Sequence, residues 1–245
     1  MSVVNNEFYN LYGDRWYTAK DDPIALLRAE TRVKLPWVLS KLKSLDFSPA
    51  KTAILDVGCG AGFLANPLAS EGFQVTGIDM SDDSLSVARR FDSTKSVNYL
   101  QADAYSLPFA DQTFDVVTAM DFLEHVEDPS SIIREFSRVL KPGGVFIFHT
   151  FNRNFLAYLV IIKFVEWFVK NTPKNMHILR LFIKPSELIG FCRSAGFKED
   201  ELTGIKPKFS HISWRDIKSG EVPDNFEFEL TSSLKLSYMG SVIKI

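Results

Sequence analysis

Short apolar runs alternate with helix-compatible segments over the middle of the chain. The runs predicted to form strands are 52–57, 73–78, 97–100, 114–120 and 145–149. The segments predicted to form helices between them are 63–69, 81–90 and 129–140. Strands that alternate with helices in this way favour βαβ units and a parallel sheet. Beyond them, the apolar stretches 226–230 and 236–243 predict further strands near the end of the chain.

Residue types that begin or end helices support this division. Ser81 can cap one helix, and Asp128 followed by Pro129 can begin another. The segment 141–144, Lys-Pro-Gly-Gly, ends that second helix. A further helix is predicted from 184–188, Lys-Pro-Ser-Glu-Leu, to the Ala-Gly-Phe at 195–197.

Residues 1–50 are predicted to form a peripheral helical cap ahead of a core that spans 51–150. Pro23 can begin a helix, and Pro36 is expected to break or kink it. Arg28 and Arg32 are four residues apart and therefore share one side of this helix. Taken alone, this spacing favours a solvated basic face over a cap on a ligand cleft.

The segment 151–183 is predicted to be an insert, after which residues 184–245 complete the same domain. Its part 155–170, FLAYLVIIKFVEWFVK, has only Lys163, Glu166 and Lys170 as charged residues. A helix here has a narrow polar stripe and a broad apolar face. Sixteen residues are too few to span a bilayer comfortably. Three interpretations stay open, which are a helix buried in the domain, a dimer interface, and peripheral contact with a membrane.

Composition and charge narrow the class of protein. The chain has 245 residues, a net charge of −2 and no overall drive towards nucleic acid. Two cysteines, Cys59 and Cys192, favour a reducing compartment. The first seven residues have neither a basic nor an apolar stretch typical of a secretion signal. We therefore expect a cytoplasmic protein, with the inner face of the membrane as the alternative location if the insert makes contact there.

The stretch 55–62, Leu-Asp-Val-Gly-Cys-Gly-Ala-Gly, joins the first predicted strand to the first helix. Glycines at 58, 60 and 62 allow a tight turn and close approach of a ligand. A dinucleotide fingerprint needs its third glycine where Phe63 stands, so this class of site is disfavoured. Asp56 would repel a pyrophosphate but suits a ligand that carries a cationic amino group.

Acidic residues stand at the ends of four successive predicted strands. They are Asp56, Asp79, Asp103 and Asp121. In open α/β sheets, ligands bind at the carboxyl ends of the strands, so these side chains predict one binding edge.

The glycine loop with these acids resembles the class I S-adenosylmethionine-dependent methyltransferases. This resemblance implies a doubly wound, Rossmann-like α/β fold with a mostly parallel seven-stranded sheet and helices on both faces. It implies that Asp79 holds the ribose, that Asp103 lies near the adenine, and that Asp56 lies near the methionine end. The other cofactor contacts expected at these strand ends and in the loop are Gly58, Gly60, Gly62, Met80 and Ala104.

A narrower resemblance rests on four further stretches. They are Met-Asp-Phe-Leu-Glu-His-Val at 120–126, Phe-Asn-Arg at 151–153, the segment 173–188, and Ser-Tyr-Met at 237–239. They resemble the ubiquinone-biosynthesis O-methyltransferases, which methylate hydroxyls of polyprenylated catechol-type precursors. The resemblance implies S-adenosylmethionine contacts at Arg32 and Met120, which revises the interpretation of Arg32 as a solvated residue.

That family carries a Glu-x-x-Glu-His motif implicated in divalent metal binding, and this chain has Asp121, Glu124 and His125 in its place. On a helix these three would share one face. Three roles stay open: ligands for magnesium, manganese or zinc, a metal-free general base at His125, or a lining of the cleft. The acceptor could also be another small molecule or lipid. A non-catalytic module that binds S-adenosylmethionine and a partner protein is the rival from another class.

Overall fold

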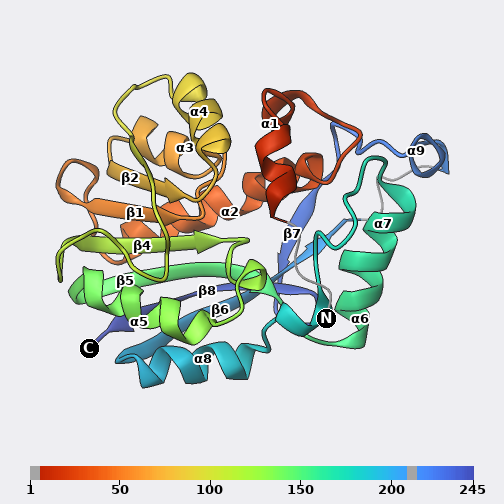
Figure 1. The fold of residues 1–245 in the computed structure, drawn as a ribbon. Coiled ribbons are helices and arrows are strands. Elements are labelled where there is room, and N and C mark those ends of the chain that lie inside the picture. Colours follow the sequence, from red (N-terminus) through yellow and green to blue (C-terminus); the bar gives the residue numbers. More distant parts are fainter. Residues whose placement is uncertain (1–5, 209–213) are drawn as a thin grey trace.

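A computed structural model describes residues 6–208 and 214–245 of the chain (Figure 1). Residues 1–5, on which the expectation of no secretion signal partly depends, lie outside it. The described strands form one sheet in the order β3-β2-β1-β4-β5-β8-β6-β7. They are β1 (Ala53–Val57), β2 (Gln74–Asp79), β3 (Asn98–Gln101), β4 (Phe114–Met120), β5 (Leu140–Phe151), β6 (Phe197–Pro207), β7 (Phe228–Thr231) and β8 (Ser237–Lys244).

Strands β1 to β5 run parallel, as the alternation of strands and helices predicts. Strands β8, β6 and β7 then continue the sheet in antiparallel fashion. The described chain has eight strands, so the expectation of seven is wrong. The strand that was not predicted is β6, which pairs with both β8 and β7. Its start, Phe-Lys-Glu-Asp-Glu, has no apolar alternation, since four of these five side chains are exposed, and the pattern therefore missed it.

Helices cover both faces of the sheet. The C-terminal half of α2, α3 and α4 pack on one face, and α5 and α8 pack on the other (Figure 1). The α-helices are α1 (Arg15–Thr18), α2 (Ile24–Ser44), α3 (Ala65–Ser70), α4 (Asp82–Phe91), α5 (Pro129–Val139), α6 (Phe155–Ala157), α7 (Val165–Phe168), α8 (Pro185–Ser194) and α9 (Trp214–Ser219). The predicted caps are confirmed, because Ser81 and Asp128 accept the backbone N–H groups of Ser84 and Ser131.

The N-terminal segment does more than cover the periphery. Helix α2 continues through Pro36 instead of ending there, and the buried Val38 and Leu42 hold its second half on the sheet. The short helix η1 (Glu7–Leu11) and α1 lie on the side of the sheet to which β4 points, where ligands bind in this architecture (Figure 1).

Residues 155–168 of the insert form one continuous helical stretch at the same side of the molecule (Figure 1). Between α6 and α7 it contains a π-helical segment, Tyr158–Phe164, a form that is rare and often found at functional sites. Its apolar surface is divided in two, because Phe155 and Trp167 are about 70% exposed whereas Ile162 is buried. Within residues 6–208 and 214–245, none of the helices has the length and apolar content needed to cross a bilayer.

Candidate active site

A cavity of about 730 Å³ opens at the carboxyl ends of the parallel strands. Most residues that the sequence nominates as site residues line it. These are Asp56, Gly58, Gly60, Asp79, Met80, Asp103, Ala104, Met120, Asp121 and His125. The cavity is therefore built by the edge of the sheet where the sequence places a ligand.

The glycines of the loop are required for two different reasons. Gly58 has φ +67°, and a Cβ there would lie 2.4 Å from the ring of Phe122. Gly62 has φ +81°, and a Cβ there would lie 2.4 Å from the Tyr99 hydroxyl. Gly58 lines the cavity, whereas Gly62 does not. The third glycine thus serves close packing beneath the loop.

Asp79 fixes the loop from the end of β2. Its carboxylate accepts the N–H of Gly60 and the N–H of Ser81, both at 2.9 Å. Burial raises its pKa above the ordinary value. A carboxylate has more acceptor positions than two N–H groups fill, so Asp79 can still accept hydroxyl groups of a ligand.

Asp56 is buried at the end of β1 and accepts the Thr118 hydroxyl at 2.7 Å. Its burial raises its pKa to about 7. Asp103 is exposed and accepts the N–H of Tyr105 at 2.9 Å. Asp56 is therefore buried and Asp103 is open to solvent, although both line the cavity.

The structure does not bring Arg32 into the cavity. Its guanidinium donates to the Phe226 carbonyl at 2.6 Å, which ties α2 to the segment before β7. Arg28, one turn earlier, donates to the carbonyls of Trp16 and Ala19. Arg28 therefore joins α2 to the segment around α1, and Arg32 joins α2 to the C-terminal part of the chain.

Aromatic residues of the N-terminal segment cover the glycine loop, which sequence reasoning missed. The Trp16 ring lies 3.2 Å from the position of a Cβ on Gly60. The Tyr17 hydroxyl donates to the Ala61 carbonyl at 2.8 Å. Tyr9 stacks on Trp16, with ring centroids 5.5 Å apart, and lines the cavity. The unusual density of aromatic residues between 8 and 17 was the available signal.

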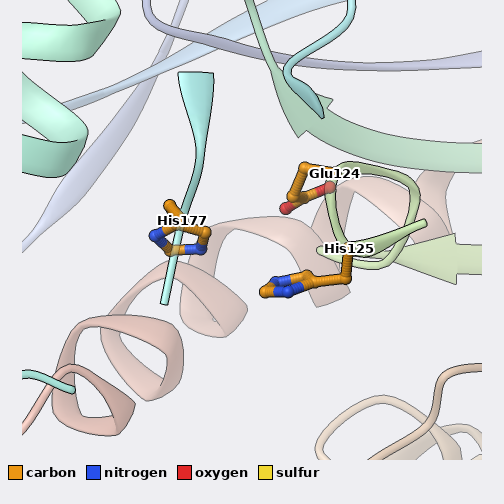
Figure 2. A group of neighbouring side chains, drawn as sticks. All are labelled: Glu124, His125 and His177. Atoms are coloured by element: carbon orange, nitrogen blue, oxygen red, sulfur yellow. The ribbon is translucent and has the colours of Figure 1, made fainter. Parts of the chain in front are cut away.

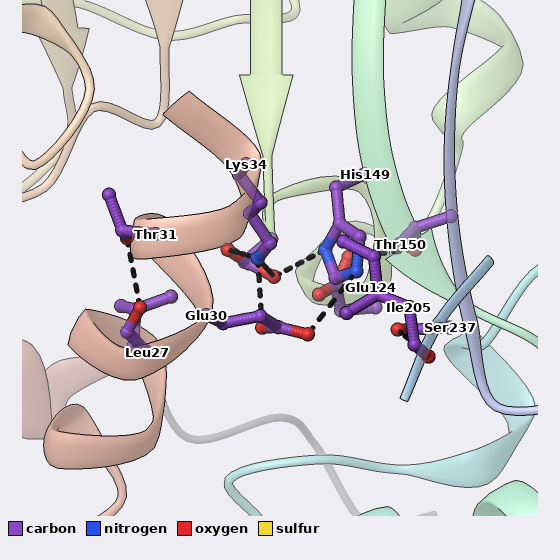
Figure 3. Close-up of polar contacts among 10 residues, drawn as sticks. Leu27, Glu30, Thr31, Lys34, Glu124, His149, Thr150, Ile205 and Ser237 are labelled. Atoms are coloured by element: carbon purple, nitrogen blue, oxygen red, sulfur yellow. Dashed lines mark hydrogen bonds and ion pairs between the residues drawn. The ribbon is translucent and has the colours of Figure 1, made fainter. Parts of the chain in front are cut away.

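Asp121 is separated from the two residues with which the motif groups it. It adopts φ +55° at the end of β4, ahead of the short helix η3 (Leu123–His125), so no common helical face exists. Both of its carboxylate oxygens accept hydrogen bonds from the Lys34 ammonium. Its Oδ1 atom lies 2.6 Å from Nδ1 of His149. Glu30 completes this cluster at 2.8 Å from Lys34 (Figure 3).

Glu124 and His125 instead meet His177, which lies in the part of the insert between α7 and α8 (Figure 2). One ligand atom of each residue lies within 4.8 Å of the others. Burial, followed by the charge of Asp121, raises the pKa of Glu124 to about 8. Burial lowers the pKa of His125 to about 4 and, with the charge of His125, that of His177 to about 3.

One oxygen of Glu124 has no hydrogen-bond partner in the described part of the chain. The Oε2 atom accepts the Thr150 hydroxyl at 2.8 Å, whereas the buried Oε1 atom makes no hydrogen bond among the described residues. Two neutral imidazoles and an unpaired carboxylate oxygen are a donor set that suits zinc or a similar divalent ion. The Glu30–Asp121–His149 cluster does not need such an ion, because the Lys34 ammonium already bridges its two carboxylates.

The far wall of the cavity is apolar. The insert contributes Val160, Ile161, Phe164, Val165, Phe168 and Val169. The C-terminal part of the chain contributes Ile205, Pro207, Val222, Pro223, Phe226, Phe228 and Leu236. One face of the insert thus points into the molecule, which leaves Phe155, Leu159 and Trp167 on the opposite, exposed face.

Comparison with known proteins agrees with this architecture. Residues 55–148 match a family model described as a methyltransferase domain. A ubiquinone biosynthesis O-methyltransferase of Thiobacillus denitrificans is 44% identical over 156 residues, which cover 62% of this chain and 67% of that protein. A protein of the same name from Pseudomonas putida is 38% identical over 194 residues, covering 78% of this chain and 81% of the relative.

Among solved structures, the magnesium protoporphyrin IX methyltransferase of Synechocystis PCC 6803, with bound SAH, has a similar fold. Its TM-score is 0.61 at 17% identity, with 100% of this chain and 90% of that chain covered. At this identity the similarity shows the fold alone.

Proposed function

The chain belongs to the family of the ubiquinone biosynthesis O-methyltransferases, and we propose that its acceptor is a phenolic hydroxyl of a polyprenylated quinone precursor. As a member of this family it is an S-adenosylmethionine-dependent O-methyltransferase. One observation carries the proposal for the acceptor. A single cavity joins an acidic, glycine-lined end, a histidine pair, and an apolar wall supplied by the insert.

The cofactor fits the end of the cavity formed by the glycine loop. We propose that Asp79 accepts the ribose hydroxyls, since it lines the cavity and has acceptor positions beyond those used by two N–H groups. Met80, Asp103 and Ala104 would flank the adenine. Gly58 and Gly60 let the backbone approach the methionine portion, and an ionised Asp56 would favour its ammonium group. The role of Arg32 as a carboxylate contact would require its side chain to leave the Phe226 carbonyl.

The reaction is a displacement at the methyl carbon. The acceptor oxygen forms a bond to this carbon while the carbon–sulfur bond breaks, and the sulfonium leaves as neutral S-adenosylhomocysteine. Alignment of the two reactants supplies much of the rate. The phenol, with a pKa of about 10, must also lose its proton. Burial lowers the pKa of His125 to about 4, so its imidazole is neutral at physiological pH and offers one ring nitrogen to that proton, but as a weak base.

The residues present fit a divalent cation at Glu124, His125 and His177, because Oε1 of Glu124 has no hydrogen-bond partner among the described residues. Such an ion, when bound, lowers the pKa of a coordinated phenol. Without it, His125 would act as the base alone. The assignment of Asp121 as a ligand is less favourable, since its carboxylate is held by Lys34.

The apolar wall supports a tailed acceptor. Val160, Phe164 and Phe168 line the cavity from one side and Phe226 from the other, so a polyprenyl chain could be buried between them. The exposed face of the insert, with Phe155 and Trp167, is suited to peripheral contact with the membrane in which such acceptors dissolve. A second subunit could instead cover the same face.

The test is turnover of matched acceptors by the purified protein. The pair comprises a 3,4-dihydroxybenzoate that carries a short polyprenyl tail on its ring and the tail-free 3,4-dihydroxybenzoate, with the methylated product measured by mass spectrometry. We expect kcat/KM to be at least about tenfold higher for the tailed catechol, since each buried methylene contributes about 0.8 kcal/mol. Equal values would contradict the tail site, and methylation of a different small molecule or lipid in place of both catechols would contradict the acceptor class.

A further inference from the structure

Asn6 contacts His125 at two points, although the residues are 119 positions apart in the chain. Its side-chain Nδ2 donates to the His125 carbonyl at 3.4 Å, and its Oδ1 lies 3.1 Å from Nδ1 of the His125 ring. Asn6 immediately precedes η1, so this contact joins the N-terminal segment to the turn that follows β4.

The two contacts together determine where the proton of the imidazole lies. A backbone carbonyl can only accept a hydrogen bond, so the atom of Asn6 that faces it must be the amide nitrogen. The amide oxygen then faces Nδ1 and can only accept, so Nδ1 carries the hydrogen. In a neutral imidazole the lone pair is then on Nε2. The ring itself extends into the space shared with Glu124 and His177 (Figure 2).

The same N-terminal segment also contacts the His125 ring through Tyr9. Tyr9 packs edge-on against His125, with centroids 5.9 Å apart, and stacks on Trp16. Trp16 in turn lies over Gly60 of the cofactor loop. Asn6 and Tyr9 therefore connect the orientation of His125 to the segment that covers the cofactor.

We propose that Asn6 is a positioning residue that holds His125 in the Nδ1–H tautomer, so that Nε2 carries the lone pair used in the reaction. The inference rests on the proposed function for its effect on rate, whereas the tautomer itself is a property of the protein without acceptor. Nε2 can then accept the phenolic proton or bind a cation, and the other tautomer could do neither from this atom.

The test compares Asn6→Leu with Asn6→Asp and with Leu11→Ala. Leucine removes both polar contacts, whereas aspartate retains the acceptor for Nδ1–H. Leu11 is 84% exposed on η1, lies outside the residues that line the cavity, and controls for general disturbance of the segment. The readout is ¹⁵N NMR of histidine-labelled protein without metal, in which the His125 signals are assigned by their loss in His125→Gln.

We expect the Nδ1–H form of His125 in the wild type, in Asn6→Asp and in Leu11→Ala, and a mixture of both tautomers in Asn6→Leu. With a catechol acceptor, kcat of Asn6→Leu should fall about tenfold, the usual effect of losing a hydrogen-bond partner of a functional histidine. The KM for S-adenosylmethionine should stay unchanged, and Asn6→Asp should recover most of kcat.

An unchanged tautomer and an unchanged kcat in Asn6→Leu would overturn the proposal. An equal fall of kcat in Leu11→Ala would also overturn it, because the effect would then belong to the segment as a whole. If Asn6→Leu does not fold, as judged by circular dichroism, Asn6→Ser replaces it with the same expectations. If the wild type turns over no catechol, the proposed function fails, while the NMR result still decides the role of Asn6.

Discussion

The Nζ atom of Lys34 lies 2.7 Å and 2.6 Å from the two carboxylate oxygens of Asp121. Burial alone would raise the pKa of Asp121, but Lys34 and His149 hold it well below its ordinary value. Lys34 is itself buried and also binds Glu30. This internal cation explains why Asp121 faces α2 and not the histidine pair.

Removal of the Lys34 ammonium should therefore lower the stability of the fold. We expect Lys34→Met to lower the free energy of unfolding by about 3–5 kcal/mol, because two buried carboxylates lose their counter-charge. Urea denaturation measures this loss. The control Lys163→Met breaks the more exposed pair with Glu166, for which a much smaller loss is expected. Equal losses in the two variants would show that the buried cluster contributes no more than a surface ion pair.

The carboxylate of Asp79 should dominate binding of the cofactor ribose. Asp79→Ala is expected to weaken S-adenosylmethionine binding by about 2 kcal/mol, or about 30-fold in Kd, since hydroxyl groups lose a charged acceptor. Isothermal titration calorimetry measures it. Asp83→Ala, on the exposed first turn of α4, should leave the affinity unchanged. An unchanged affinity in Asp79→Ala would remove this residue from the cofactor site.

Asp56 should make stability depend on pH. Its pKa rises from 3.8 in the unfolded chain to about 7 in the folded protein, so the folded protein keeps a proton that the unfolded chain has lost. Stability is then full below about pH 4 and falls as pH rises from about 4 to about 7, by an amount on the order of 4 kcal/mol. Asp56→Asn stays neutral, so its stability relative to the wild type should increase between about pH 4 and about pH 7 and stay constant above. If the free energies of unfolding of the wild type and Asp56→Asn change in parallel with pH across this range, the shift in the pKa of Asp56 is excluded.

The parallel half of the fold could be predicted because its signals are local. Strands β1, β2 and β4 coincide with short, mostly apolar runs, and Ser81 and Asp128 mark helix starts by their own hydrogen bonds. Strand β6 was not predicted because the residues at its exposed start are charged. A strand of this kind is defined by its neighbours in the sheet, and a single sequence does not show them.

The strand-end acids could be predicted for the same reason, since strand order places them at one edge. The partners of the residues proposed for catalysis could not. Asp121 has a left-handed backbone conformation, with φ +55°, and is therefore not part of a helix. Its side chain pairs with Lys34, 87 positions earlier. His177 and Asn6 reach His125 from distant segments. Such contacts depend on how helices and loops close over the sheet, and spacing within a motif carries no information on them.

The exposed face of the insert gives a prediction for membrane contact. Replacement of Phe155 and Trp167 by glutamate should release the protein from anionic liposomes, because both side chains are largely exposed and could enter the interface. Methylation of tail-free 3,4-dihydroxybenzoate should survive. Flotation of the vesicles measures binding. Absence of liposome binding by the wild type would leave the dimer interface as the explanation of this face.

Val160→Glu with Phe164→Glu is the matched change on the inner face of the insert. Because these residues line the cavity, we expect loss of activity on the tailed acceptor with liposome binding retained. The two double variants thus separate binding of the membrane from binding of the acceptor tail. Release from liposomes by the inner pair alone would contradict the assignment of faces.

The last prediction concerns which residues hold a divalent cation. The unpartnered Oε1 of Glu124 lies with His125 and His177, whereas Asp121 is neutralised by Lys34. We therefore expect His177→Ala to abolish binding of Co²⁺, measured by its visible absorption and by calorimetry, and Asp121→Asn to retain it. Chelation should stop methyl transfer while S-adenosylmethionine still binds. Full activity after exhaustive chelation would favour His125 as a base without metal, and retention of Co²⁺ by His177→Ala with loss in Asp121→Asn would return the ligand set to the sequence motif.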